Sequence, residues 1–330
     1  MTAGLRPSAL AAHGGRSPLG IDLSASLNPL GPSPAAMAAA RAADLTRYPD
    51  ATAAPLAAAA AARHGIPETA VVPIPGASWA LWFVLVSLGG AGRRCAALGP
   101  CFGEYRRAAE IAGYDYAETG ASLERVLAEA PDVLLLGNPS NPGAEAIPAG
   151  RLAAACAAAR LTLVVVDEAF AAFAPAGTSL VEGALPPANA VVIRSLTKEL
   201  GMPGLRMGYA IATLERAAAL RGMLPAWPLS APALAAAAAG CADLDHIRAG
   251  ADAGRRHVAA MAAALARAGA AVRPSDANYL LCRAPGLLDR LAARGIAGRD
   301  CASFGLAAGH ARLAAPAPAD LDAVLDAIGG

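Results

Sequence analysis

The sequence predicts an α/β fold, with a large domain built on a mostly parallel sheet with flanking helices and a smaller α+β domain at the C-terminus. Between residues 71 and 212, short apolar runs alternate with helical segments rich in alanine, which is the pattern of a doubly wound domain. Residues 161–166 are apolar without alternation, as expected for a parallel strand that is covered on both faces. Shorter strands and helices follow a proline-rich segment at 225–230, and they indicate the second domain.

Three segments are predicted along the 330-residue chain: an N-terminal arm at 1–34, the large domain at 35–225 and the small C-terminal domain at 226–330. The arm is rich in Gly, Pro, Ser and Asn, which favours loops over helices. Terminal segments of this kind commonly fray. The alternative is an arm that crosses the site, with Asn28 placed by Pro29 and Gly31.

The elements of the large domain follow from its apolar runs and their boundary residues. Helices are predicted at about 35–43, 54–64, 79–88, 100–112, 123–129, 151–160 and 214–223, with Gly65 as the C-cap of the second. Strands are predicted at 71–74, 94–98, 114–118, 133–136, 161–166, 191–195 and 208–212. In the small domain we expect helices at about 231–244, 247–268, 285–293 and 321–328, and strands at 271–273, 278–282, 296–299 and 311–314.

Composition excludes several classes of protein. Hydrophobic residues make up 56% of the chain and charged residues 16%, but no uninterrupted apolar span is long enough to predict a transmembrane helix. The N-terminus does not resemble a signal peptide. The net charge of +1, without a basic cluster, argues against nucleic acid as the main partner. The six scattered cysteines are expected to be reduced in a cytoplasmic protein, and we expect no metal site.

One stretch, residues 191–210, indicates a cofactor. A β-branched run breaks into Ser195, Thr197 and Lys198, and Arg206 follows eight positions after the lysine. Burying an ammonium group is costly unless it is neutralised or used covalently, and hydroxyls with an arginine could bind a phosphate. Together they predict a lysine that forms a Schiff base with pyridoxal phosphate. Taken alone, the stretch also fits a surface lysine in a strand-to-loop turn.

Two further strands end in polar residues. Asp167 follows the strand at 161–166, at the end of a parallel strand where open α/β sheets bind ligands; a helix cap or turn aspartate is the alternative. Two Asn-Pro pairs, beginning at Asn138 and Asn141, impose extended geometry twice and direct the Asn141 side chain to a fixed place.

Other candidates carry weaker signals. Gly76, Ala77 and Ser78 open a helix and offer an anion site, although many helices begin this way. Phe102 could lie against an aromatic ring or in the core. Arg312 is either a carboxylate clamp or an edge-strand arginine, and His13 fits a loop histidine better than a catalyst.

These motifs converge on a known family. The chain contains Asn138-Pro-Ser-Asn141-Pro, Asp167-Glu-Ala-Phe170, Ser195-Leu-Thr-Lys198 and Gly204-Leu-Arg206-Met-Gly208. Over nearly its whole length it resembles fold type I pyridoxal-phosphate enzymes of the aspartate aminotransferase superfamily. Within them it is similar to the histidinol-phosphate aminotransferases and to the L-threonine-O-3-phosphate decarboxylases of cobalamin synthesis. The arm motifs His13-Gly-Gly15 and Asp22-Leu-Ser-Ala-Ser-Leu-Asn28-Pro-Leu-Gly31 resemble the decarboxylases.

The resemblance implies a role for each candidate. Lys198 would hold the cofactor aldehyde and later carry a proton, and Asp167 would pair with the pyridine nitrogen. The remaining cofactor contacts would come from Asn141 at the phenolic oxygen, Phe102 and Phe170 beside the ring, Gly76, Ala77, Ser78, Ser195, Thr197 and Arg206 at the phosphate, and Tyr48 from a second subunit of a homodimer. Arg312 would bind the substrate carboxylate, with Asn28 and His13 on the substrate side.

The resemblance also defines the expected reactions. The first is decarboxylation of L-threonine O-3-phosphate, and the runner-up is a histidinol-phosphate-type transamination that uses 2-oxoglutarate. A catalytically silent member of the fold that binds a metabolite is the third alternative, against which the intact set of Asp167, Asn141, Lys198 and Arg206 argues. The chain departs from the common aminotransferase pattern at Phe170, where a tyrosine is usual, in the turn after Asn141, and after Ser78, where an acidic residue is often found.

Overall fold

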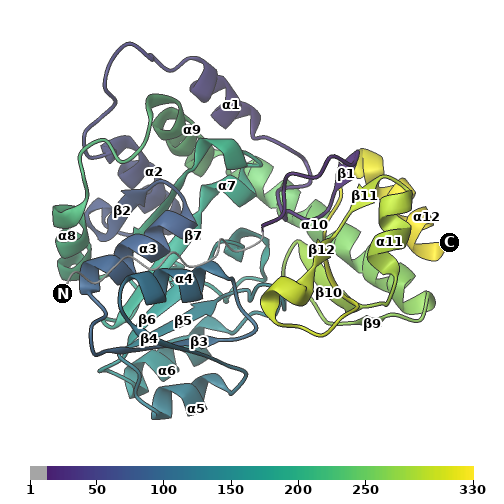
Figure 1. The fold of residues 1–330 in the computed structure, drawn as a ribbon. Helices are drawn as coiled ribbons and strands as arrows, with labels where there is room; N and C mark the ends of the chain where they lie inside the picture. Colours follow the sequence, from purple (N-terminus) through teal and green to yellow (C-terminus); the bar gives the residue numbers. More distant parts are fainter. Residues whose placement is uncertain (1–12) are drawn as a thin grey trace, which may run out of the picture.

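A seven-stranded sheet forms the centre of the molecule in the computed structural model, which describes residues 13–330 (Figure 1). Its strands lie in the order β2 (Val71–Ile74), β8 (Gly208–Ile211), β7 (Ala190–Ser195), β6 (Leu163–Asp167), β5 (Val133–Gly137), β3 (Arg94–Leu98) and β4 (Asp115–Thr119). The five strands from β7 to β4 are parallel, whereas β8 is antiparallel to both of its neighbours. The predicted mostly parallel sheet is confirmed.

Helices cover both faces of this sheet because successive strand residues point to opposite sides. Leu134 and Leu136 of β5 pack in a core with α2 (Ala54–His64), α5 (Leu123–Ala128) and α6 (Ala149–Ala158). Val133 and Leu135 pack on the other face with α3 (Ala77–Leu88), α4 (Glu104–Ile111) and α8 (Leu214–Met223). Two separate cores therefore hold the carboxyl ends of β5, β6 and β7 at one edge.

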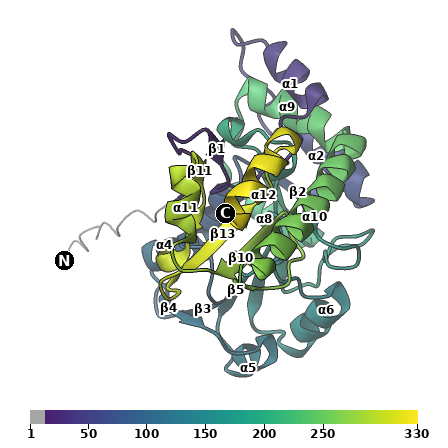
Figure 2. The same ribbon diagram turned by 90° about the vertical axis from the view of Figure 1, so that its right-hand side faces the viewer.

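The small domain is built on an antiparallel sheet. Its strands lie in the order β12 (Arg299–Asp300), β13 (His310–Ala314), β10 (Tyr279–Arg283) and β9 (Ala271–Val272). The long helix α10 (Leu244–Arg267), α11 (Leu287–Ala293) and α12 (Leu321–Gly329) pack around it, as Figure 2 shows for α10 and α12. Leu280 and Leu313 of the sheet are fully buried against Met261 of α10.

The N-terminal arm connects the two domains. β1 (Ile21–Asp22) pairs in parallel with β11 (Ile296–Ala297) of the small domain. Farther on, the arm bonds to α7 (Leu196–Glu199) and the residue after it: the backbone N–H of Asn28 donates to the carbonyl of Lys198 at 2.9 Å, and that of Ser33 donates to Leu200 at 3.0 Å. The described part of the arm thus crosses the molecule, while residues 1–12 lie outside the described residues.

The helices that follow the predicted boundary at 225/226 pack in both cores. Helix α9 (Ala231–Ala242), which follows the proline-rich segment, packs against α1 (Pro34–Arg41) and α2. Its alanines form part of the large-domain core, and so does Ile247 at the start of α10, whereas Val258 farther along packs in the small-domain core. The change from one core to the other therefore takes place along α10. Alanine periodicity shows that a helix forms but does not show which domain it packs against.

Most other elements lie within a few residues of their predicted bounds. The predicted bounds of α2, β2, β3 and α8 agree with the structure, and Gly65 caps α2 with a φ of 65°. The predicted strand at 296–299 is divided into β11 and β12. The strand β1 and the single-turn helix α7 were not predicted, because two- and four-residue elements carry no periodicity.

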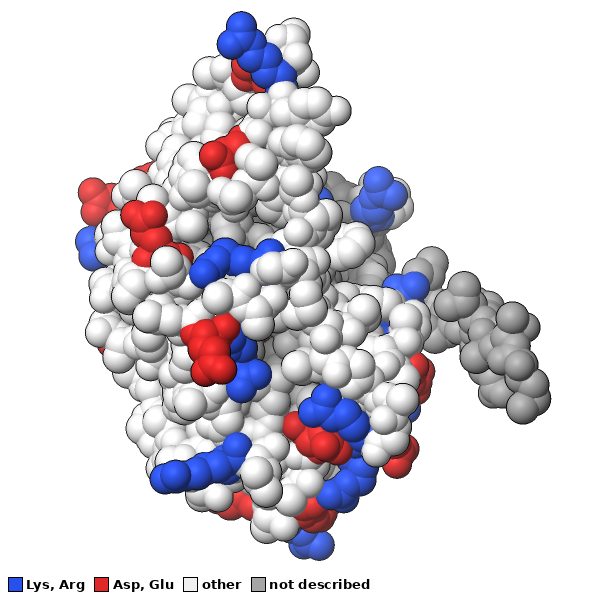
Figure 3. All heavy atoms as spheres, turned by 90° about the vertical axis from the view of Figure 1, so that its left-hand side faces the viewer, with Lys and Arg blue, Asp and Glu red and all other residues white. Residues whose placement is uncertain are grey.

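Several surface features bear on possible partners. In the part of the chain that the structure describes, no helix has the length and hydropathy needed to span a membrane. No three His, Cys, Asp or Glu side chains among residues 13–330 gather as a metal site. All six cysteines are buried and unpaired. Figure 3 shows one face on which cations and anions are scattered singly or in opposite-charge pairs among uncharged residues.

The contact between the arm and α7 depends on a glycine. Gly201 has a φ of +63°, and a Cβ there would be pressed into the backbone carbonyl of Gly31. We expect Gly201→Ala to destabilise the fold by about 3 kcal/mol, through backbone strain and overpacking. Urea unfolding would measure this, with Gly204→Ala as the control, because a Cβ at Gly204 meets nothing within 4 Å. Equal stability of both variants would contradict the prediction.

Candidate active site

A cavity of about 360 Å³ opens at the carboxyl ends of β5, β6 and β7. Its walls come from the large domain, the small domain and the arm. Twelve of the residues singled out from the sequence line it: His13, Ala77, Ser78, Phe102, Asn141, Asp167, Phe170, Ser195, Thr197, Lys198, Arg206 and Arg312. Polar residues that follow different strands meet here because parallel strands end at one edge of the sheet.

Lys198 lies in α7, directly after β7, with its amine in the cavity. Burial, helped by the positive charges of Arg312 and Arg206, lowers the pKa of Lys198 to about 8. A desolvated ammonium loses its proton more readily than one in water. The Lys198 amine is therefore substantially neutral near pH 8, and the neutral amine is the form that attacks a carbonyl carbon.

Asp167 is the last residue of β6 and also faces the cavity. Burial raises the pKa of Asp167 to about 6, while hydrogen bonds from the Ala169 backbone and the Tyr105 hydroxyl act in the opposite direction. The Tyr105 hydroxyl donates to Oδ2 of Asp167 at 3.1 Å, and Ala169 N donates to Oδ1 at 3.0 Å. These donors fix the carboxylate, and a cation or protonated nitrogen beside it would be strongly held.

Asn141 and Arg312 are coupled. Nη1 of Arg312 donates to Oδ1 of Asn141 at 2.6 Å, and its Nη2 donates to the carbonyl of Ser24 at 2.6 Å. An arginine has only donors, so the amide oxygen of Asn141 must face the guanidinium. This orientation leaves the amide N–H groups of Asn141 as donors for a ligand oxygen in the cavity.

An anion cradle forms where α3 begins. Gly76 has a φ of +94°, and a Cβ there would lie 2.9 Å from Nη2 of Arg206. Ala77 and Ser78 are the first residues of this twelve-residue helix, where free N–H groups and the helix dipole attract anions. Ser195 adds a hydroxyl, which lies 2.8 Å from that of Thr197. These donors fit a phosphate group.

Aromatic rings line the rest of the cavity. Phe102 lies with its ring centroid 5.6 Å from that of His13 and 6.0 Å from that of Tyr105. Phe170 packs edge-on against Tyr279, at 4.8 Å between centroids. Phe170 thus contributes an apolar wall and no hydroxyl, in keeping with its departure from the tyrosine common at this place in aminotransferases.

Three predicted residues do not line the cavity. The Asn28 side chain instead donates to the carbonyl of Glu199 at 2.8 Å and accepts from the N–H of Leu30 at 3.0 Å. It anchors the arm to α7. Gly76 shapes the phosphate cradle from behind. Tyr48 is 80% exposed and stacks on Trp227 at 4.6 Å, outside the cavity of its own chain.

Several cavity residues escaped the sequence reasoning, among them Ser24, Ser26, Tyr105, Arg299, Ser303 and Phe304. Tyr105 had a usable signal, since it follows Phe102 by three positions in the segment predicted to be helical, and such residues share a face. Arg299 had none. It pairs with Arg312 across β12 and β13, and strand pairing of this kind cannot be read from one sequence.

The comparisons with known proteins agree with this geometry. Residues 19–328 match the aminotransferase class I and II family. The chain is 34% identical over 229 residues to a threonine-phosphate decarboxylase of Sinorhizobium sp, covering 68% of this chain and 67% of that protein. It is 31% identical over 303 residues to the histidinol-phosphate aminotransferase of Symbiobacterium thermophilum, covering 87% and 83%.

The chain belongs to the aminotransferase class I and II family. The fold is also that of a solved histidinol-phosphate aminotransferase from Sinorhizobium meliloti, described in complex with pyridoxal-5'-phosphate, with a TM-score of 0.81, 23% identity and coverage of 92% and 88% of the two chains. Family membership confirms the predicted cofactor, pyridoxal phosphate. The residues fit it: a buried amine, a buried carboxylate, an amide donor and a cradle for one phosphate.

The lowered pKa of Lys198 leads to a pH prediction. The rate at which apoprotein attaches pyridoxal phosphate covalently should rise with pH and level off above about 8, because the neutral amine is then fully formed. With an ordinary lysine, the rate of attachment would continue to rise until about pH 10.4. Stopped-flow absorbance between about pH 6 and about pH 10 would measure this rate, and Lys198→Ala should attach no cofactor. A rate that climbs without levelling through this range would refute the assignment.

Proposed function

We propose that this protein decarboxylates L-threonine O-3-phosphate to (R)-1-amino-2-propanol O-2-phosphate in cobalamin biosynthesis, with pyridoxal phosphate as cofactor. The observation that carries the proposal is the balance of charge around the cavity. Arg206, Arg299 and Arg312 line it, against the single carboxylate of Asp167. The cradle with Arg206 accounts for the cofactor phosphate. The other two guanidinium groups are suited to a substrate that bears two anionic groups.

Arg299 and Arg312 come from paired strands of the small domain. Nη2 of Arg299 donates to the Ser303 hydroxyl at 2.8 Å, and the guanidinium lies 5.4 Å from the Phe304 ring centre. In the proposed complex Arg312 binds the substrate carboxylate and Arg299 binds its phosphate. The two anions of a phosphorylated amino acid would thus be held by neighbouring strands that move together.

When bound, pyridoxal phosphate supplies an aldehyde for the substrate amine and a ring that accepts electrons from a bond at Cα. Asp167 would hold a proton at the ring nitrogen, and Asn141 would donate to the phenolic oxygen. Once the carboxylate has left Cα as CO₂, Lys198 would deliver a proton from Nζ to Cα. Phe102 and Phe170 exclude water beside the reacting carbon.

Two observations support decarboxylation over transamination. The arm motifs and the 34% identity to a threonine-phosphate decarboxylase favour that reaction. The cavity must also hold cofactor and substrate together in about 360 Å³, which favours a compact substrate. The second candidate is a histidinol-phosphate-type aminotransferase, supported by the relative that is 31% identical and covers 87% of this chain.

We also propose that the enzyme is a homodimer in which Tyr48 reaches the cofactor phosphate of the partner subunit. Tyr48 is 80% exposed and does not line the cavity of its own chain. It stacks on Trp227, which is itself 48% exposed. An exposed aromatic pair of this kind commonly marks a protein interface.

The purified holoprotein should release CO₂ from L-threonine O-3-phosphate when no oxo acid is present. A decarboxylase needs no acceptor for the amino group, whereas a transaminase does. Monitoring CO₂ and the phosphorylated amine product would test this. Holoprotein that releases no CO₂, but transaminates histidinol phosphate once 2-oxoglutarate is added, would replace the proposal with the second candidate.

The role of Arg299 predicts a specific kinetic change. Arg299→Gln removes a charged hydrogen bond to the substrate phosphate, which is worth about 1.5–3 kcal/mol. We therefore expect kcat/KM for the phosphorylated substrate to fall about tenfold or more, mainly through KM. Steady-state CO₂ release would measure it, and Arg294→Gln, on the exposed surface of the same domain, should leave it unchanged. An unaltered KM in Arg299→Gln would exclude this role.

A further inference from the structure

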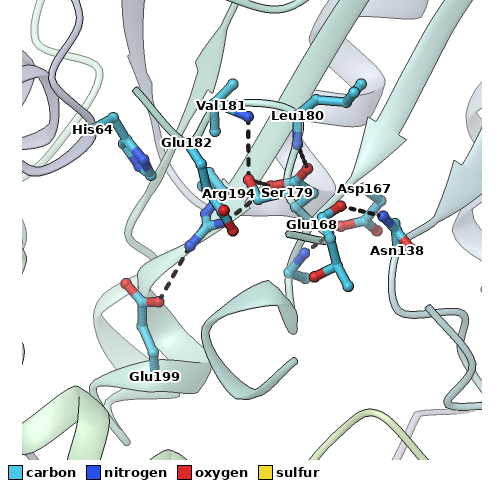
Figure 4. A network of polar contacts seen from close by, with 12 residues as sticks. His64, Asn138, Asp167, Glu168, Ser179, Leu180, Val181, Glu182, Arg194 and Glu199 are labelled. Atoms are coloured by element: carbon cyan, nitrogen blue, oxygen red, sulfur yellow. Dashed lines mark hydrogen bonds and ion pairs between the residues drawn. The ribbon is translucent and has the colours of Figure 1, made fainter. Parts of the chain in front are cut away.

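Beneath the cofactor site lies a second, fully buried layer of charge. Asp167 and Lys198 line the cavity. The residue after each of them is buried and does not line the cavity: Glu168 after Asp167, and Glu199 after Lys198 (Figure 4). Arg194, which precedes the cavity residue Ser195 in β7, points to the same side.

One guanidinium joins these two neighbours. Nη1 of Arg194 donates to Oε2 of Glu168 at 2.9 Å, and its Nη2 lies 3.9 Å from Oε2 of Glu199. All three residues are buried: Glu168 is 1% exposed, Arg194 is 5% exposed and Glu199 is 3% exposed. Arg194 is therefore an ionic link between the end of β6, which carries Asp167, and the helix that carries Lys198.

Further contacts complete each carboxylate. Glu168 also accepts from the Ser179 hydroxyl at 2.6 Å and from the Leu180 backbone at 2.9 Å. Glu199 accepts two hydrogen bonds from Arg63, one of them at 3.0 Å. The layer thus holds two arginines and two glutamates and is electrically balanced.

His64 lies near this layer in Figure 4 and adds no charge to it. Burial, together with the positive charges of Arg194 and Arg63, lowers the pKa of His64 to about 2. Its Nε2 is 2.8 Å from the Tyr209 hydroxyl. His64 is therefore neutral beside the ionic layer at neutral pH.

Such a layer is an expensive way to stabilise a fold, because desolvation of buried ions commonly offsets their attraction, and well-packed apolar residues can do as well. Its advantage is geometric specificity. Hydrogen-bonded ion pairs fix the distance and angle between two groups, whereas apolar contacts allow the groups to shift. The helix α7 spans only Leu196–Glu199, and one helical turn is not stable alone. Its position, and that of Lys198, therefore comes from tertiary contacts, which include the fully buried Leu196 in the apolar core, the arm, and the ion pairs of this layer.

We propose that Arg194 is a positioning residue that holds Lys198 in register with Asp167 by bridging Glu168 and Glu199 behind the cofactor site. The parallel ladder joins β6 to β7 as far as Asp167 and Ile193, and one more backbone bond runs from Glu168 N to the Ile193 carbonyl at 2.8 Å. No backbone bond of the described residues joins Glu168 to α7 itself. Lysine cannot replace Arg194, because an ammonium does not offer two separated donors in one plane.

The test compares Arg194→Lys and Arg194→Met with a control variant, Asn189→Ala, just before the same strand. Asn189 immediately precedes β7 at its opposite end and donates to the carbonyls of Cys156, Ala159 and Thr162, each at 3.0 Å. Asn189→Ala should therefore destabilise folding without touching the site. Three quantities would be measured: the urea midpoint, the Kd of pyridoxal phosphate for the apoprotein, and the pH at which the absorbance of the bound cofactor changes.

For both Arg194 variants we expect the cofactor Kd to rise about tenfold or more, since small displacements of reacting groups are costly, and the absorbance transition to move in pH. Asn189→Ala should show neither effect at a comparable urea midpoint. If the Arg194 variants change only the urea midpoint, or if Asn189→Ala changes the cofactor properties equally, the layer is merely structural and the proposal fails.

Glu168→Gln provides a milder variant should Arg194→Met not fold. It keeps the shape of the side chain and an acceptor for Ser179, but removes the negative charge that holds Arg194. We expect a smaller rise in the cofactor Kd of the same kind, and an unchanged Kd would overturn the proposal. All these measurements concern the cofactor alone, so their outcome is independent of whether the substrate is decarboxylated or transaminated.

Discussion

The structure depends on one constraint. An amine and a carboxylate must both be held in a buried cavity without forming a permanent ion pair with each other. Lys198 and Asp167 meet this by standing at the ends of adjacent parallel strands, each shifted toward its neutral form by burial. The surrounding features hold these two groups in place. The apolar cores on both faces of the sheet hold the strand ends, the arm secures the short lysine helix, and the ionic layer fixes it from behind.

Residues at strand ends could be predicted from the sequence, whereas residues placed by tertiary pairing could not. Asp167, Asn141 and Lys198 each follow an apolar run, so their types and positions already indicated a shared edge. Arg299 lines the cavity because β12 pairs with β13. The Asn28 side chain lies outside the cavity, where it donates to the Glu199 carbonyl of α7. The packing of α9 against α1 and α2 could not be predicted for a similar reason, since a run of alanines does not indicate which helices it will contact.

The same cofactor site serves two reactions among the relatives, and the electrostatics of this cavity indicate where they diverge. The cofactor groups lie in the large domain, at the sheet edge. The groups assigned to the substrate, Arg299 and Arg312, lie on neighbouring strands of the small domain. If these proposed roles hold, the small domain and the arm would set the orientation of the substrate about Cα, while the groups proposed for the cofactor would stay the same. Such a division explains why motifs alone identify the cofactor more readily than the chemistry.

The path of the arm has a mechanical consequence. The two domains are joined both by α10, whose ends pack in different cores, and by the segment that runs from β1 to α7. A body attached at two points can swing about the line between them but resists twisting or pulling apart. A rotation of the small domain about this line would be carried to the backbone of Lys198 through the hydrogen bond that Asn28 N donates to its carbonyl. Substrate entry would then be coupled to the position of the Lys198 amine.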